Sequence, residues 1–212
     1  QAIKVSEKQG LIERLSVART NLAELCHCAG NFRKGLALAD RAINESREVN
    51  HLHGVGIGLR YRAILLGDLG RHAEADENAT EAVGIQQSLG HHEEELASKV
   101  SLVRVVLAQG NIHRADRLLE SCLSLTAAYD TEGYLPIIQA WRSRLMMTCG
   151  ERAAAIAQLE QTEGTGRSWP HQRLRQLLNT ARSWSLVGRK ETAAELADAA
   201  LRLADSCGYR YY

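Results

Sequence analysis

Small and apolar residues recur along the chain at fixed distances from a series of glycines. These glycines follow one another at intervals of 40, 40, 40 and 38 residues: Gly30, Gly70, Gly110, Gly150 and Gly188. Five, nine and twelve residues after each glycine stands a small or apolar residue, in most cases alanine. Spacings of four and three residues place these positions on one face of a helix. A face of small side chains lets another helix pack closely, so the pattern predicts a series of closely packed helices.

The positions before each glycine follow the same register. Four residues before it, the residues are Cys26, Leu66, Val106, Met146 and Trp184. Each repeat is therefore predicted to contain a first helix, a turn at the glycine and a second helix. The first helices are expected near residues 12–29, 53–69, 93–109, 134–149 and 170–187, and the second helices near 32–49, 72–89, 112–128, 152–162 and 190–206. Glycine suits the turn because a left-handed helix end costs least without a Cβ, and Asn31 and Asn111 are expected to cap the second helices that follow.

The repeats are expected to form one array that spans residues 1–212. Its units are predicted at about 12–50, 51–90, 91–130, 131–168 and 169–208, and Glu163–Pro170 breaks the register as a hinge or kink. Residues 1–10 are expected to be a partial second helix, because Ala2 aligns with Ala42. The array is thus expected to be excised from a larger protein, with uncapped ends that favour self-association.

The aligned columns resemble tetratricopeptide repeats. The resemblance rests on a small residue before the turn, the glycine itself and alanines after it: Ala23, Gly30 and Ala42; Ala63, Gly70, Ala75 and Ala82; Gly110 and Ala115; Ala181, Gly188, Ala193 and Ala200. The period is longer than the family's usual length of about 34 residues. The aromatic residue after the turn survives only as Phe32, and the prolines that end the second helix are absent.

This resemblance implies an all-α fold, a right-handed α-solenoid of antiparallel helix pairs. Longer variants of this kind resemble the repeat regions of large bacterial regulators. Among these are LuxR-type transcription activators with an ATPase module, and multidomain kinases or cyclases.

Composition agrees with a helical array and gives no indication of a nucleic-acid or membrane partner. Hydrophobic residues make up 45% of the chain and aromatic residues 5%, with two prolines, which favours ordered helices packed through alanine and leucine. The 26 basic and 25 acidic residues give a net charge of +1, so no overall field indicates nucleic acid or membrane. An odd number of cysteines, five, indicates reduced thiols in the cytoplasm.

Two short motifs suggest chemistry and have simpler interpretations. The run Gly54–Gly58 resembles a nucleotide-binding loop, but such a loop follows a strand, whereas the register places it at the start of a helix. Cys26 and Cys28 are two residues apart on a predicted helix, so both thiols cannot hold one metal ion. We find no combination of nucleophile, base and oxyanion site. We therefore expect no enzyme activity, no catalytic residue, no cofactor and no metal site.

The most informative polar column lies six residues before each glycine. It contains Glu24, Ile64, Arg104, Arg144 and Arg182. In tetratricopeptide arrays this face of the first helices lines the concave groove that receives ligands. The resemblance therefore implies a groove formed by Arg104, Arg144, Arg182, Trp141, Tyr61 and Asn179. Arginine binds carboxylates and phosphates bidentately and stacks on aromatic rings. The alternative is a solvated arginine face with acidic partners in the same chain.

The sequence thus predicts a non-catalytic interaction scaffold or sensor segment of a larger cytoplasmic bacterial signalling or transcription-regulatory protein. Its expected partners are an acidic protein or peptide and the other domains of its own chain, and neither nucleic acid nor membrane. The alternative function is an inducer-binding module that recognises a small anionic ligand or short peptide in the groove.

Overall fold

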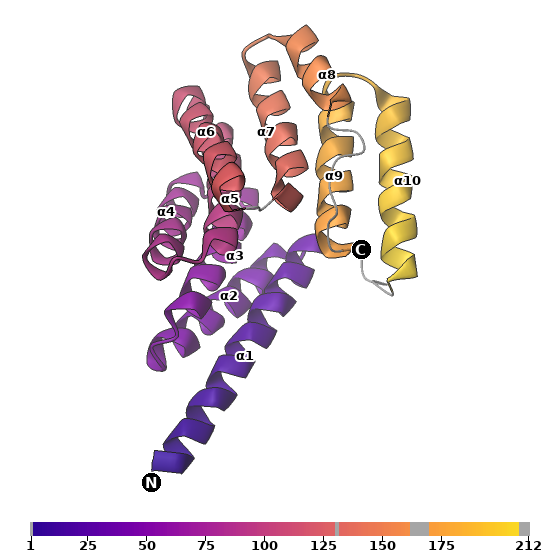
Figure 1. Cartoon of the computed structure of the whole chain (residues 1–212). Helices are drawn as coiled ribbons and strands as arrows, with labels where there is room; N and C mark the ends of the chain where they lie inside the picture. The colour runs from indigo at the N-terminus through magenta and orange to yellow at the C-terminus, as the bar shows by residue number, and fades with distance from the viewer. Residues whose placement is uncertain (1, 130–131, 162–169, 208–212) are drawn as a thin grey trace. The chain divides into compact units, whose positions relative to one another are not determined.

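The computed structural model describes residues 2–129, 132–161 and 170–207. These residues form ten α-helices and one short 3-10 helix, and none of them belongs to a strand (Figure 1). The all-α class is therefore confirmed. No helix in the described ranges is long and apolar enough to cross a membrane. The expected hinge after residue 162 lies outside the described residues.

The helices alternate as the register predicts. The first helices of the repeats are α1 (Ala2–Cys28), α3 (Leu52–Asp68), α5 (His92–Ala108), α7 (Leu135–Thr148) and α9 (Pro170–Leu186). The second helices are α2 (Phe32–Glu48), α4 (His72–Leu89), α6 (Ile112–Tyr129), α8 (Arg152–Glu160) and α10 (Lys190–Ser206). The 3-10 helix η1 (Glu132–Tyr134) precedes α7. Apart from the start of α1, every predicted helix end lies within two residues of the observed one.

The glycine turns have the conformation that the sequence predicts. The five repeat glycines have φ between 71° and 83°, a left-handed backbone that costs least without a side chain. At Gly70, for example, the N–H of Arg71 donates to the carbonyl of Leu66 over 2.9 Å and closes the helix end. Asn111 caps α6 by accepting the N–H of Arg114, whereas the described residues include no such side-chain bond from Asn31.

The start of the chain corrects one prediction. Residues 1–10 do not form a separate partial helix, because α1 runs without interruption from Ala2 to Cys28. Gly10 stands in register with Asn50 and Gly90, which have φ of 55° and 67° where α2 and α4 end. At Gly10 the backbone stays helical instead. A glycine permits the left-handed turn but does not require it, and a helix tolerates one at modest cost.

The helices form two compact units, residues 1–109 and 110–212. In the first unit α1 packs against α2 and α3, and α3 packs against α4 and α5. The predicted alanine columns are fully buried, with Ala39, Ala75, Ala79 and Ala82 at 0% exposure. Small side chains thus allow the close packing that the sequence predicts.

Glycines bring α3 especially close to its neighbours. A Cβ on Gly58 would lie 2.7 Å from Cγ1 of Ile43, and one on Gly56 would lie 2.5 Å from Nε2 of Gln86. Gly54 is equally close to Ser46. The run Gly54–Gly58 is therefore a helix-packing motif, as the register predicts, and not a nucleotide-binding loop.

The second unit contains α6 to α10 with η1. Ala155 and Leu159 of α8 pack against Trp184 of α9 and against Val187, which follows α9. Leucines of α9 pack against Ala200 and Ala204 of α10. The chain order first helix, turn, second helix therefore continues to residue 206.

Overpacking of an alanine column should destabilise the first unit. We expect Ala75→Leu to lower the free energy of unfolding by about 1–3 kcal/mol, because a fully buried position leaves no room for three more carbons. Urea denaturation followed by far-UV circular dichroism measures this change. Ala73→Leu, on an exposed position of the same helix, should change it by less than about 0.5 kcal/mol. Equal effects of the two substitutions would contradict close packing through Ala75.

Candidate functional site

Asp68 links three consecutive first helices in the first unit. It lies at the end of α3, where its carboxylate accepts a hydrogen bond from Arg104 of α5 and lies 2.7 Å from Nε2 of His27 on α1. Arg104 is one of the predicted groove arginines. In the structure it therefore has an acidic partner within the chain. Side-chain exposures of 20–28% place this network at the edge of the packed region.

The environment of Asp68 shifts its protonation. Burial raises the pKa of the carboxyl group, but the hydrogen bond with His27 and the positive charge of Arg104 outweigh this effect. The pKa of Asp68 is therefore held below its ordinary value of 3.8. The folded unit thus favours the charged carboxylate, which stabilises the contact between α3 and α5 at neutral pH.

Tyr61, another predicted groove residue, is buried within the first unit. Its side chain is 6% exposed, so little of the ring is open to a ligand. The guanidinium carbon of Arg60 lies 4.9 Å from the ring centroid, and Arg60 also forms an ion pair of 3.1 Å with Glu94 of α5. Around Tyr61 the polar groups therefore connect α3 to α5.

In the second unit the structure brings together Trp141, Arg144 and Asn179. The guanidinium carbon of Arg144 lies 4.2 Å from the Trp141 ring centroid, within the range of a cation–π interaction. Its Nη2 donates to the backbone carbonyl of Asn179 over 3.0 Å, and its Nε donates to Oγ of Ser183 over 3.1 Å. Arg144 therefore connects α7 to α9 and lies over an aromatic ring.

Arg182, one helical turn from Asn179 on α9, is exposed. Two exposed leucines flank it at four residues on either side, Leu178 at 40% and Leu186 at 59%. A spacing of four places the three side chains in one row along the helix. We call this row, with Trp141 and Arg144 of the adjacent helix, the α7–α9 face. It combines an exposed cation with apolar surface.

The predicted groove residues thus fall into two groups. Trp141, Arg144, Asn179 and Arg182 lie in the second unit, where Arg144 contacts Trp141 and Asn179, whereas Arg104 and Tyr61 belong to the first unit. A continuous row of three arginines therefore stays a prediction. Sequence reasoning missed Asp68 because its column, two residues before each glycine, shows no common residue type. It also missed Leu178 and Leu186, although their spacing around Arg182 was visible in the sequence.

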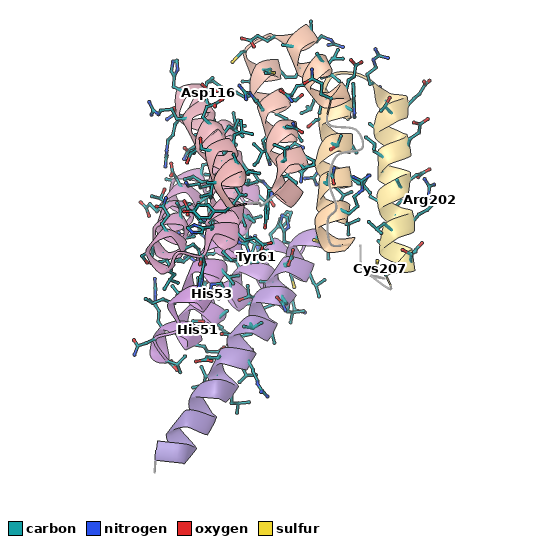
Figure 2. The ribbon with its side chains drawn as sticks, viewed as in Figure 1. His51, His53, Tyr61, Asp116, Arg202 and Cys207 are labelled. Carbon is teal, nitrogen blue, oxygen red and sulfur yellow. The ribbon has the colours of Figure 1, made fainter. Side chains whose placement is uncertain are left out.

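Other parts of the surface have different chemistry. A hollow on the first unit is lined by Ala73, Asp76, Glu77, Thr80, Glu81 and Gln109. Three carboxylates in this lining disfavour an anionic ligand there. In helix α1, Cys26 is buried and Cys28 exposed, and His27 contacts Asp68. Among the residues that the structure describes, no group of three His, Cys, Asp or Glu side chains is placed to hold a metal ion. Figure 2 shows the side chains of the described residues on the ribbon, with Tyr61 of α3 among those labelled.

The fold is similar to those of solved helical-repeat proteins. Nearly identical TPR-like repeats of a Podosopora anserina kinesin light chain share 22% identity, with a TM-score of 0.60 over 93% of this chain and 98% of theirs. BtubC (BKLC) from P. vanneervenii shares 19% identity, with a TM-score of 0.63 over 100% of this chain and 88% of its own. A TPR protein of Thermus thermophilus shares 22% identity, with a TM-score of 0.55 over 90% and 92% of the two chains. These likenesses define the class, an α-solenoid of helix pairs.

A family model gives the more specific assignment. The model described as "Tetratricopeptide repeat" matches residues 16–41, which span the second half of α1 and the first part of α2. No curated protein sequence matches the chain. The matched residues therefore resemble one tetratricopeptide repeat, and the similar structures show that the chain has the fold of a TPR-like solenoid.

The Asp68 network should stabilise the first unit in a pH-dependent way. We expect Asp68→Asn to lower the free energy of unfolding by about 1–3 kcal/mol at pH 7, because charged hydrogen bonds are lost. A lowered pKa contributes stability above the unfolded-state pKa and loses it as the pH falls through the folded-state pKa. The difference in the free energy of unfolding between the native and variant proteins should therefore be largest above about pH 5 and shrink below about pH 4. Urea denaturation at several pH values measures it.

Glu77→Gln provides a matched control for this experiment. Glu77 is exposed on α4, so the substitution should change the free energy of unfolding by less than about 0.5 kcal/mol. A pH-independent difference for Asp68→Asn would contradict the proposed contribution of the carboxylate charge.

Proposed function

We propose that this chain is a non-catalytic module that binds a protein or peptide segment within a larger regulatory protein of the bacterial cytoplasm. Tetratricopeptide repeats generally mediate protein–protein interactions, which supports the first part of this proposal. The long period of the repeats supports the second part, through the resemblance to signalling and transcription-regulatory proteins. A repeat array also presents a long open surface. Such a surface suits the binding of an extended partner better than catalysis in an enclosed pocket.

The α7–α9 face is the proposed binding surface. The observation that carries this choice is the exposed guanidinium of Arg182 between two exposed leucines. Exposed apolar side chains beside a cation are typical of recognition surfaces, where the apolar contacts contribute affinity and the charge contributes specificity. On the adjacent helix α7, Arg144 lies over the Trp141 ring and donates to the backbone carbonyl of Asn179 on α9.

The chemistry of this face defines the partner. A guanidinium selects a carboxylate or phosphate, and the leucines at four-residue spacing select apolar groups on either side of it. We therefore propose a peptide segment that carries an acidic side chain flanked by apolar ones. Arg104 contributes less to such binding, because its charge is neutralised by Asp68. A small anionic ligand would use the guanidinium alone and not the leucines.

Reversal of the charge at Arg182 should weaken peptide binding. The probes are fluorescent synthetic peptides with one Glu flanked by leucines, and matched peptides with Gln in its place. We expect Arg182→Glu to lower the affinity for the Glu peptides by roughly two- to thirtyfold, because repulsion replaces an exposed ion pair of about 0.2–1 kcal/mol. Fluorescence anisotropy measures this change. Binding should also weaken with salt, since the Debye length falls from about 10 Å at 0.1 M to 3 Å at 1 M.

Arg202→Glu is the matched control, because Arg202 is an exposed arginine on the neighbouring helix α10 (Figure 2). It should leave the affinity unchanged. An equal loss in both variants, or binding that is indifferent to salt, would contradict the proposed face. Displacement of the peptide by a small dianion such as succinate would instead favour the small-ligand function.

A further inference from the structure

Two histidines meet where the first helices of the second and third repeats begin. His53 lies in the first turn of α3, and His91 directly precedes the first residue of α5 (Figure 2 labels His53). Their Nδ1 atoms are 2.9 Å apart, and their ring centroids are 4.6 Å apart with an angle of 86° between the ring planes. His53 is partly buried and His91 is exposed, so an ion from solvent can reach the pair.

The protons of the two rings decide what the pair can bind. A neutral imidazole carries its proton on one nitrogen and offers a lone pair on the other. One Nδ1 can therefore donate to the other Nδ1, and this hydrogen bond accounts for the contact. When both rings carry the proton on Nε2 instead, two Nδ1 lone pairs are available side by side. Lone pairs of neutral imidazoles are the commonest metal ligands in proteins.

The distances within the pair fit two neighbouring ligands of one metal ion. Metal–imidazole bonds are about 2.0–2.1 Å long, so two such nitrogens at a right angle around an ion lie about 2.9 Å apart. Because each ring extends behind its nitrogen, the ring centres then lie about 4.5 Å apart. Both values agree with the observed 2.9 Å and 4.6 Å. A tetrahedral angle at the ion would instead separate the nitrogens by about 3.3 Å.

Gln86 of α4 places a fixed oxygen beside the pair. Its side chain has 0% exposure, and its Nε2 donates to the backbone carbonyl of His53 over 3.3 Å. Its Oε1 lies 3.3 Å from Nδ1 of His53. A carbonyl oxygen held in this position can accept a hydrogen bond from a water molecule bound to an ion. Partners of this kind orient the ligands of a metal and raise its affinity.

We propose that His53 and His91 bind one divalent transition-metal ion through their Nδ1 atoms, with water in the remaining positions. A site with two protein ligands is compatible with the finding that, within the described ranges, no three His, Cys, Asp or Glu side chains are placed to hold a metal. The right angle favours the octahedral or tetragonal geometry of Ni²⁺ and Cu²⁺ over the tetrahedral geometry of Zn²⁺. A metal at this place differs from the expectation drawn from the sequence.

The ion joins two first helices of consecutive repeats. Helices α3 and α5 pack against each other, and Asp68 and Arg104 connect them near their C-terminal ends. The ion fixes the N-terminal ends of the same two helices. Because it binds the folded unit, it also stabilises that unit. The site is independent of peptide binding at the α7–α9 face, which belongs to the second unit.

Calorimetric titration of the purified chain with nickel chloride tests this proposal. The native chain should bind one Ni²⁺ ion at the pair. His53→Gln and His91→Gln should each lower the affinity by at least about tenfold, because each removes one of only two protein ligands. The matched control is His113→Gln, since His113 is an exposed histidine near the start of α6. It should leave the affinity unchanged.

A spectroscopic measurement identifies the ligands independently. With one equivalent of Cu²⁺, the electron paramagnetic resonance spectrum of the native chain should show two imidazole nitrogens on the ion. Circular dichroism checks that the variants are folded, and His91→Gln alters an exposed side chain outside the core. Absence of Ni²⁺ binding up to about 1 mM overturns the proposal. An affinity that His91→Gln leaves unchanged, an equal loss in His113→Gln, or a single nitrogen on Cu²⁺ also overturns it.

Discussion

Close approach between helices through small side chains is the constraint on which the other features of this protein depend. Alanines at 0% exposure fill the contact between the first and second helices, and glycines of α3 bring Ile43 and Gln86 against its backbone. Close-packed interiors leave little freedom in the position of such helices. Because the spacing between helices is set in this way, polar side chains on the first helices reach the next first helix and can form specific contacts there.

The two units use these polar positions differently. In the first unit Asp68 joins His27 and Arg104, so the charges neutralise one another and stabilise the packing of three helices. In the second unit Arg144 donates to a backbone carbonyl and lies over Trp141, and Arg182 stays exposed beside two leucines. One repeat scaffold thus supports a charge-neutralised surface in one unit and a surface with an exposed cation in the other.

The sequence by itself determined the repeat length, the class of fold, the glycine turns and nearly every helix end. These features are local: a glycine with positive φ, a capping residue and an apolar spacing of three and four act within one or two turns of chain. Tertiary structure decided the rest. Gly10 has the residue type of a turn and stays helical, and Arg104 and Arg182 share one column but differ in their partners. Asp68 in α3 neutralises the first, whereas the second is exposed between two leucines. The contacts of an arginine depend on side chains some 40 positions away in sequence, and a column of similar residues does not specify those partners.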